Sequence, residues 1–355
     1  MLNGRKTRVL IVDDSAIVRK ILSDALAGEP DLEVVGTAPD PYIARDKILA
    51  LAPDVLTLDI EMPRMDGLTF LKKLMHFHPM PVVVISSLAQ PSCRIAVEAL
   101  ENSAVEAMAK PGGPYSVGEL RKSLADKIRA AAYSRVKPPA AVPAPRPPSM
   151  PPAGLPSPCT GAILAIGAST GGTEAIATVL RELPPNSPPI VIVQHIPPEF
   201  SKAFAGRLND LSAIEVREAA DGDMLHPGLA LVAPGDLHML LKKTGGRYSV
   251  AVKTGPRVCY QRPSVDVLFS SVAESAGAAA TGVILTGMGS DGAQGILKMR
   301  QAGAYTIAQN EATCVVFGMP REAIGLNAVD QILPLHGIAG ALINSKPARR
   351  SAAAS

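Results

Sequence analysis

The chain has 355 residues, a net charge of +3, no tryptophan and an aromatic content of only 3%. So small a charge gives no strong phosphate-binding field, and so few aromatic side chains give no base-stacking surface, so we expect no nucleic-acid partner. The apolar runs are far shorter than the roughly 20 residues of a membrane helix. The four cysteines are scattered, as in proteins with reduced thiols. Both features favour a cytoplasmic protein without direct membrane insertion.

The length and the proline content predict two domains joined by a linker. A single hydrophobic core stops growing near about 250–300 residues. Between Pro138 and Pro158, ten of 21 residues are proline, which prevents both helix formation and core packing. We therefore predict a first domain over residues 1–133, a Pro/Ala-rich linker over 134–158, a second domain over 159–346 and a flexible tail over 347–355.

Residues 8–130 alternate strand-sized apolar runs with helix-length amphipathic segments. Strands that alternate with helices form a parallel sheet that is covered on both faces. The first domain is therefore predicted to be a doubly wound α/β domain. Its predicted strands include Arg8–Val12, Val55–Leu58, Val82–Ile85 and Val105–Met108, and its predicted helices include Ala16–Leu26, Tyr42–Leu51, Leu68–Met75 and Arg94–Leu100.

Polar residues stand at the carboxyl ends of these predicted strands. Asp13 and Asp14 follow the first strand, and Asp59, Ser86 and Lys110 end the later ones in order. Because the carboxyl ends of parallel strands meet in one crevice, we expect these side chains to lie together. Taken singly, Asp14 could cap a helix and Lys110 could be a solvated loop cation. Together they favour a site where Mg²⁺ is bound, where lysine and hydroxyl hold phosphoryl oxygens, and where Asp59 attacks phosphorus.

With these residues in place, the first domain resembles a response-regulator receiver domain. The resemblance rests on the Asp13-Asp14 pair, the run Leu-Asp-Ile-Glu-Met-Pro-Arg-Met-Asp-Gly over residues 58–67, Ser86 and Lys110-Pro111. It implies a flavodoxin-like sheet, with Asp59 as the phosphoacceptor and with Ser86 and Lys110 supporting the phosphoryl group.

The same resemblance implies a magnesium site and shows one departure from the family pattern. It assigns Mg²⁺ to Asp14, Asp59 and the main-chain carbonyl of Glu61, with Asp13 assisting through a water molecule. Three residues before the lysine, where receivers usually carry an aromatic switch residue, this chain has Ala107. Signal transmission through an aromatic rotamer is therefore not expected here.

Residues 161–335 repeat the alternation of strands and helices, so we predict a second α/β domain with a mainly parallel sheet. Between its first apolar run and the helix-like segment Thr173–Arg181 lies the sequence Gly-Ala-Ser-Thr-Gly-Gly, which places Ser169 at a strand-to-helix turn. Glycines there permit unusual backbone angles, and the helix start offers N–H donors to an oxyanion. The apolar runs are Ala162–Ile166, Ile190–Gln194, Leu229–Ala233, Val283–Thr286 and Tyr305–Gln309.

A nucleophilic serine needs a base and an acid that orients the base. His195 directly follows an apolar run, and Asp291 lies in a Gly-rich loop after another, so both are expected at the same sheet edge as Ser169. Taken singly, each could be structural, and His238 and Asp236 remain competing candidates. The chain order serine, histidine, aspartate differs from that of α/β-hydrolases and argues against a lipase-like enzyme.

From Ile166 onward the chain resembles the catalytic domain of the chemotaxis protein-glutamate methylesterases, the CheB family. This stretch carries six motifs of that family, and a receiver followed by such a domain is the architecture of the methylesterase that resets bacterial chemoreceptors. The motifs are Gly-Ala-Ser-Thr-Gly-Gly, Gln-His-Ile-Pro-Pro, Ala-Pro-Gly-Asp-Leu-His-Met, Arg-Pro-Ser-Val-Asp-Val-Leu-Phe, Leu-Thr-Gly-Met-Gly-Ser-Asp-Gly and Ala-Gln-Asn-Glu-Ala-Thr-Cys-Val-Val-Phe-Gly-Met-Pro.

This resemblance implies the roles of the second domain. Ser169 is the nucleophile, His195 the base, Asp291 the orienting acid, and the Met288 backbone N–H an oxyanion donor. The implied reaction is hydrolysis of glutamate methyl esters on receptor helices, with deamidation of receptor glutamines as a second activity and no cofactor. The implied partners are methyl-accepting chemotaxis receptors as substrate and a chemotaxis histidine kinase as phosphodonor.

Overall fold

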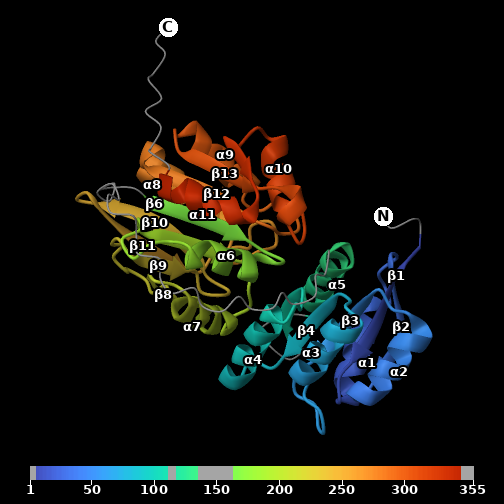
Figure 1. Ribbon diagram of the computed structural model, residues 1–355. Coiled ribbons are helices and arrows are strands. Elements are labelled where there is room, and N and C mark those ends of the chain that lie inside the picture. The colour runs from blue at the N-terminus through green and yellow to red at the C-terminus, as the bar shows by residue number, and fades with distance from the viewer. Residues whose placement is uncertain (1–4, 111–116, 135–162, 345–355) are drawn as a thin grey trace. The chain divides into compact units, whose positions relative to one another are not determined.

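The computed structural model describes residues 5–110, 117–134 and 163–344, which fall into two compact units (Figure 1). Almost all of the predicted linker and the whole predicted tail lie outside these residues, so the proposed domain boundaries stay predictions.

The N-terminal unit is built on a five-stranded parallel sheet with the order β2-β1-β3-β4-β5. This confirms the predicted doubly wound sheet and gives the bounds of its second strand, β2, for which the sequence showed no clear apolar run. The helix α1 packs against α5, and α3 packs against α4. The elements are β1 (Thr7–Val12), α1 (Ala16–Leu26), β2 (Leu32–Ala38), α2 (Pro41–Leu51), β3 (Val55–Asp59), α3 (Gly67–Phe77), β4 (Val82–Ser86), α4 (Gln90–Glu101), β5 (Glu106–Ala109) and α5 (Val117–Tyr133).

Local chemistry explains where these elements begin. Every residue of the central strands β3 and β4 is buried, as expected for parallel strands covered on both faces, and so is every residue of the edge strand β5. Three helices start at side-chain caps that satisfy free backbone N–H groups: Ser15 caps α1, Asp40 caps α2 and Asp66 caps α3. The caps fix the loops that follow the strands, and these loops carry the predicted polar cluster.

The C-terminal unit contains a seven-stranded parallel sheet with the order β14-β13-β12-β6-β7-β9-β8, and a separate antiparallel pair, β10 with β11. The strands are β6 (Ile163–Ala168), β7 (Ile190–Gln194), β8 (Glu215–Glu218), β9 (Leu229–Val232), β10 (His238–Thr244), β11 (Arg247–Lys253), β12 (Ala280–Ile284), β13 (Tyr305–Gln309) and β14 (Gln331–Leu333). The helices are α6 (Gly172–Arg181), α7 (Phe200–Leu211), α8 (Val265–Ala276), α9 (Ala293–Gln301), α10 (Met319–Gly325) and α11 (Leu335–Asn344), with short 3₁₀ turns η1 (Gly277–Ala279) and η2 (Glu311–Thr313).

The order of these strands gives a topological switch point at β6. This strand lies between β7, which follows it in the chain, and β12, which comes much later, so the chain runs outward from β6 in both directions. Loops diverge at such a switch point and leave a crevice outside the carboxyl ends of the strands. The helices α6, α7 and α11 form one packed group, and α8, α9 and α10 form another. The switch point therefore lies at the sheet edge where the serine, histidine and aspartate were expected.

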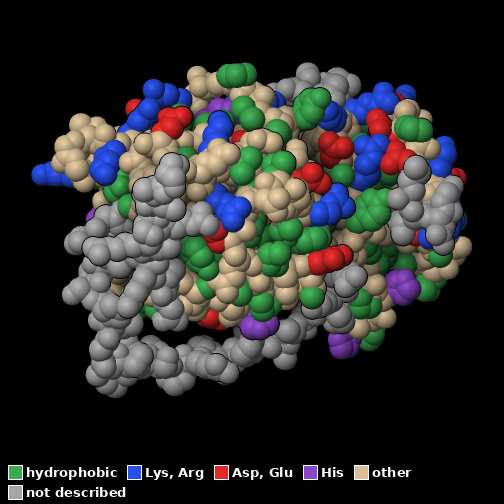
Figure 2. All heavy atoms as spheres, turned by 90° about the horizontal axis from the view of Figure 1, so that it is seen from above, with side chains coloured by type: hydrophobic (Ala, Val, Ile, Leu, Met, Phe, Trp, Pro, Cys, Tyr) green, Lys and Arg blue, Asp and Glu red, His purple; other side chains and the backbone are tan. Residues whose placement is uncertain are grey.

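Two surface properties bear on partners. In the part of the chain that the structure describes, no helix combines the length and the apolar character needed to cross a membrane. On the face drawn in Figure 2, basic and acidic side chains are interspersed and do not gather in a patch of one sign. This agrees with the small net charge of +3.

Candidate functional site

Ser169 lies in the turn between β6 and α6, as the sequence predicted. Its backbone N–H donates to the Thr286 carbonyl at 3.0 Å, and its carbonyl accepts from the Gly172 N–H at 2.7 Å. Gly171 adopts φ +75°, and a side chain there would lie 2.5 Å from Val315. The turn is therefore held from both sides, and Ser169 keeps only 8% of its surface exposed.

Gln194 connects the serine turn to the histidine. The strands β6 and β7 pair in parallel with Ala168 opposite Gln194, so the residues that follow them, Ser169 and His195, are neighbours across the sheet edge. The His195 N–H donates to the Ala168 carbonyl at 3.1 Å. The Gln194 amide donates to the carbonyls of Ser169 at 2.9 Å and His195 at 3.2 Å. One buried side chain thus fixes both turns.

His195 and Asp291 form a buried hydrogen bond. Nε2 of His195 lies 2.7 Å from Oδ2 of Asp291, and the two residues are 7% and 2% exposed. An ionised carboxylate only accepts hydrogen bonds, so the ring proton belongs on Nε2. Nδ1 is buried and has no hydrogen-bond partner among the described residues. It is therefore the ring atom available to accept a proton at the edge where Ser169 lies.

The Asp291 carboxylate is stabilised as an anion. Burial alone would raise its pKa, but hydrogen bonds from His195, Ser264 and the start of α8 hold the pKa below its ordinary value. Oδ1 accepts from Ser264 Oγ at 2.7 Å and from the Asp266 N–H at 3.0 Å, and Oδ2 accepts from the Val265 N–H at 2.7 Å. The carboxylate therefore stays charged and faces His195 in one orientation.

The competing candidates have other partners. Asp236 accepts hydrogen bonds from Arg257 at 3.0 Å and from Arg262 at 2.8 Å. Nε2 of His238 lies 2.9 Å from the Pro256 carbonyl, and its Nδ1 accepts from the Ser264 N–H at 3.3 Å. Both ring nitrogens of His238 are thus occupied, and Asp236 is bound in an arginine cluster. The structure thus pairs His195 with Asp291, whereas His238 and Asp236 bind other groups.

The loop that carries Met288 approaches the serine closely. At Gly287 a side chain would lie 2.7 Å from the Ser169 Cβ, so only glycine fits. The Gly287 carbonyl accepts from the N–H groups of Gly318 at 3.1 Å and Met319 at 2.8 Å, which fixes the loop. Met288 is half-buried and follows directly. Its place beside Ser169 fits an oxyanion donor, and that role stays a prediction.

In the N-terminal unit the predicted carboxylates meet as expected. Oxygen atoms of Asp13, Asp14 and Asp59 all lie within 4.8 Å of one another. Lys110 Nζ lies 2.8 Å from Asp59 Oδ2 and 3.9 Å from Asp13 Oδ2. Asp13 Oδ2 is buried and has no hydrogen-bond partner among the described residues. Three carboxylates, one of them with a buried oxygen that accepts no hydrogen bond from any described residue, are a donor set that suits a hard divalent cation such as Mg²⁺.

Burial gives Asp59 unusual acid–base behaviour. The side chain is fully buried, and desolvation raises the pKa of Asp59 to about 6, although hydrogen bonds from Lys110 and the Glu61 N–H oppose the rise. Burial also raises the pKa of Asp13. Desolvation acts to lower the pKa of Lys110, but its hydrogen bond to Asp59 prevails and raises it. Contact with Lys110 thus stabilises the negative charge in this cluster, whereas burial and repulsion between the carboxylates oppose it.

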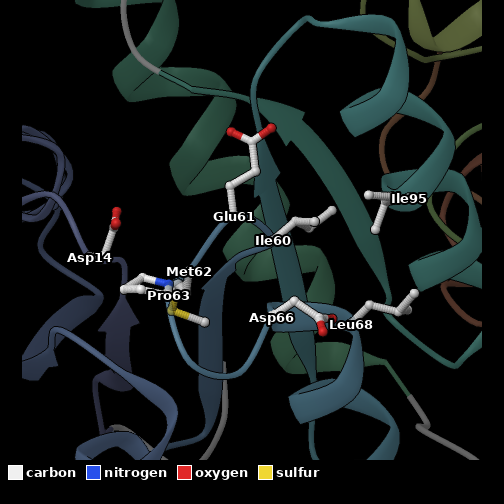
Figure 3. A pocket seen from close by; sticks show the side chains of 8 residues that line it. All are labelled: Asp14, Ile60, Glu61, Met62, Pro63, Asp66, Leu68 and Ile95. Carbon is white, nitrogen blue, oxygen red and sulfur yellow. The ribbon is translucent and has the colours of Figure 1, made fainter.

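Ser86 ends β4, as the sequence predicted, but its hydroxyl and the Glu61 carboxylate have partners that the sequence did not indicate. Ser86 Oγ donates to the carbonyls of Ser87 and Ser92, each at 3.2 Å. The Glu61 carboxylate accepts from the hydroxyls of Ser87 and Ser92. In Figure 3 this carboxylate points away from Met62. The cavity drawn there measures about 520 Å³ and is lined by Asp14, Ile60, Glu61, Met62, Pro63, Asp66, Leu68 and Ile95.

The raised pKa of Asp59 predicts a pH-dependent stability in magnesium-free buffer. Folded Asp59 binds its proton more tightly than the unfolded chain does, so the contribution of Asp59 to stability is fullest below pH 3.8 and is lost as the pH rises through about 6. In wild type we expect this effect to lower the free energy of unfolding of the unit by about 1–3 kcal/mol over that pH range, and in Asp59→Asn the decrease should be absent. Calorimetry of the unfolding transition measures both. The exposed carboxylate Asp46 provides the control Asp46→Asn. Parallel curves for wild type and Asp59→Asn would contradict the prediction.

Two residues of the C-terminal site were missed by sequence reasoning. Gln194 was noted only as the end of an apolar run and as part of a family motif, and Ser264 only as part of a family motif. Ser264 followed two residues later by Asp266 is a helix-start signal, so the sequence alone could have predicted the N-cap of α8. Its contact with Asp291 joins residues 27 positions apart in the chain and carries no local signal.

Comparisons with known proteins agree with both halves of the chain. The family model for the response regulator receiver domain matches residues 9–123, and the model for CheB methylesterase matches residues 164–342. Protein-glutamate methylesterase/protein-glutamine glutaminase 2 of Syntrophus aciditrophicus is 55% identical over 95% of this chain and 98% of its own length. The corresponding protein 4 of Anaeromyxobacter dehalogenans is 54% identical over 94% of each.

A solved structure extends the agreement to the fold. The crystal structure of the Thermotoga maritima CheB methylesterase catalytic domain is 41% identical, has a TM-score of 0.51 and covers 52% of this chain and 97% of its own. Because the sequence identity extends over nearly the full length of the relatives, this chain shares both the receiver and the catalytic domain with them. The chain therefore belongs to the CheB family of chemotaxis response regulators, the protein-glutamate methylesterase/protein-glutamine glutaminases.

Proposed function

We propose that this protein hydrolyses glutamate methyl esters on the cytoplasmic helices of chemotaxis receptors, under the control of its receiver domain. The observation that carries the proposal is the 2.7 Å hydrogen bond between His195 and Asp291 at the sheet edge that also holds Ser169. Membership of the family supplies the substrate class, because the relatives are named for this ester and for glutamine.

The proposed chemistry starts at the serine. Ser169 Oγ attacks the ester carbonyl while Nδ1 of His195 takes its proton, and Asp291 holds the resulting imidazolium. The same ring then gives the proton to the departing methoxide, so methanol leaves and an acyl-serine remains. Water, activated by the same base, attacks the acyl group and regenerates both the serine and the free glutamate. In this proposal the Met288 N–H stabilises the oxyanion of each tetrahedral intermediate.

The same site explains a second proposed activity. A glutamine side chain has the same carbonyl geometry as a glutamate ester, with an amide nitrogen in place of the methoxy oxygen. Proton transfer from His195 to that nitrogen releases ammonia, and hydrolysis of the acyl-serine again leaves glutamate. Protein-glutamine deamidation therefore requires no residue beyond Ser169, His195 and Asp291, and the relatives carry both activities in their names.

The receiver is proposed to accept a phosphoryl group on Asp59 from a chemotaxis histidine kinase. Asp13, Asp14, Asp59 and the Glu61 carbonyl would hold Mg²⁺, which would neutralise charge on the phosphoryl oxygens when bound. Lys110 lies 2.8 Å from Asp59 and is placed to pair with one of those oxygens. A modest rotation of Ser86 would let its hydroxyl leave the Ser87 and Ser92 carbonyls for another. Phosphorylation would then raise the output of the catalytic domain.

The test is methanol release from methylated receptor membranes by the purified protein. We expect release without phosphodonor to be slow, and to rise several-fold with acetyl phosphate and Mg²⁺. In Asp59→Asn the slow release should persist and the rise should disappear, because no carboxylate remains to take the phosphoryl group. Absence of release under every condition would overturn the esterase proposal, and a rise that survives Asp59→Asn would overturn the role of Asp59 alone.

A further inference from the structure

We propose that Ser264 is a positioning residue of the active site, whose hydroxyl holds the Asp291 carboxylate in the orientation that receives His195. The inference rests on the proposed hydrolase function, which requires a fixed base. It adds to the serine, histidine and aspartate a fourth side chain that touches neither the substrate nor the nucleophile.

Ser264 is buried and has two roles through one oxygen atom. As the N-cap of α8, its Oγ accepts from the Val267 N–H at 3.4 Å. The same hydroxyl donates to Asp291 Oδ1 at 2.7 Å. The second bond is much shorter and has a charged acceptor, which makes it the stronger of the two. Only 1% of the surface of Ser264 is exposed, so water does not compete for this hydroxyl.

The division of donors between the two carboxylate oxygens explains why Ser264 matters. Oδ2 takes the His195 Nε2–H and the Val265 N–H, whereas Oδ1 takes the Ser264 hydroxyl and the Asp266 N–H. Three of the four donors come from the start of α8 and its cap. Two donors on Oδ1 prevent the carboxylate from turning about its Cβ–Cγ bond. With one removed, Oδ2 is less firmly directed at His195.

Other titratable groups near this bond do not replace the hydroxyl. Asp266 faces Asp291 from α8, and burial raises its pKa. Cys259 faces it from the loop before α8, and burial likewise raises the pKa of its thiol. His238, at the start of β10, accepts from the Ser264 N–H and makes no hydrogen bond to Asp291 among the described residues. Each like charge near Asp291 would oppose its ionised form, so the Ser264 hydroxyl is the compensating side-chain contact on Oδ1, beside the backbone N–H of Asp266.

Substitutions at Ser264 separate its two roles. Glycine is almost as good an N-cap as serine but has no hydroxyl, whereas alanine loses both the cap and the donor. In the full-length protein we expect kcat for ester hydrolysis to fall about 10-fold or more in both Ser264→Ala and Ser264→Gly, with KM unchanged. Only Ser264→Ala should lose much thermal stability. Ser264→Thr keeps the hydroxyl and should restore kcat.

The pH profile gives a readout that a purely structural role would not move. Without the Ser264 donor, the Asp291 carboxylate carries more negative charge toward the ring and stabilises protonated His195. The base form then requires a higher pH, so the acid limb of the kcat/KM profile should move to higher pH in Ser264→Ala and Ser264→Gly.

Ser271→Ala is the matched control. Ser271 lies on the same helix, is 5% exposed, accepts from the Leu241 N–H at 2.8 Å and donates to the Leu268 carbonyl at 2.7 Å. Its loss should lower stability and leave the pH profile unchanged. Wild-type kcat and pH profile in Ser264→Gly would overturn the proposal and leave Ser264 as a helix cap alone.

A second measurement keeps this proposal separate from the proposed function. The proton between His195 and Asp291 is expected to give a downfield NMR signal in the full-length protein, assigned by its loss in His195→Gln. In Ser264→Gly this signal should exchange faster with water than in wild type. Failure of wild type to hydrolyse esters would contradict the proposed function, while an unchanged signal in Ser264→Gly would contradict the positioning role.

Discussion

Ser169→Ala is expected to lower kcat for ester hydrolysis by about 10⁴- to 10⁶-fold, because triad members act as a unit and loss of the nucleophile removes the acyl intermediate. The fold should persist, since the turn is held by backbone bonds of Ser169 to Thr286 and Gly172 and not by the hydroxyl. Methanol release and thermal unfolding, measured on the same preparation, check both statements. Stability should change by less than about 0.5 kcal/mol.

A control serine distinguishes chemistry from packing. Ser187 is 4% exposed, lies before β7 at the opposite end of the strand, and donates to the Pro184 carbonyl at 2.7 Å. Ser187→Ala should cost about 1 kcal/mol of stability and leave kcat intact. A serine-directed phosphonate should label wild type at Ser169 and leave Ser169→Ala unlabelled. Turnover by Ser169→Ala within 10-fold of wild type would show that another group is the nucleophile.

Asp291→Asn is expected to lower kcat by about 10⁴-fold while changing almost no volume. Four donors converge on this side chain, among them Ser264 Oγ and His195 Nε2. An amide offers one oxygen in place of two, so its NH₂ must face a donor or displace one. If it faces the ring, His195 moves its proton to Nδ1 and loses the acceptor that Ser169 needs.

The neighbouring carboxylate supplies the control for this second prediction. Asp266 is close in the sequence to Ser264, accepts from the Gly295 N–H at 2.6 Å and has no hydrogen bond to His195 among the described residues. Asp266→Asn keeps that acceptor, so kcat should hardly change. Nitrogen NMR of the ring should show the proton on Nε2 in wild type and in Asp266→Asn, and on Nδ1 in Asp291→Asn. An unchanged tautomer in Asp291→Asn would refute the orienting role.

Residues at strand ends were predictable because they follow directly on strong local signals. Asp59 ends β3, Ser169 follows β6 and His195 follows β7, and in each case a fully buried apolar strand precedes a polar residue. Parallel strands place their carboxyl ends together whatever the order of the strands. Sequence reasoning therefore found residues that meet at each site without knowing which strands are neighbours.

Strands with weak apolar patterns were not predictable in this way. β2 and β8 lie at the edges of their sheets, and most of their residues are half-buried or exposed. The strand β12 begins at Ala280, before the predicted run at Val283, because small residues such as Gly282 fit there beneath Met299. The strand lies between β6 and β13 in the sheet, and the helices α8, α9 and α10 pack against it.

The sequence by itself determined the two α/β halves, the acidic cluster with Lys110, and the serine, histidine and aspartate, because each depends on periodicity, on residue type and on position at a strand end. Only the tertiary structure decided that His195 pairs with Asp291 while His238 has other partners. It alone joined Ser264 to Asp291, and Glu61 to the serines after β4. These are contacts between side chains far apart in the chain, whose geometry depends on strand order and helix packing, and no local pattern encodes either.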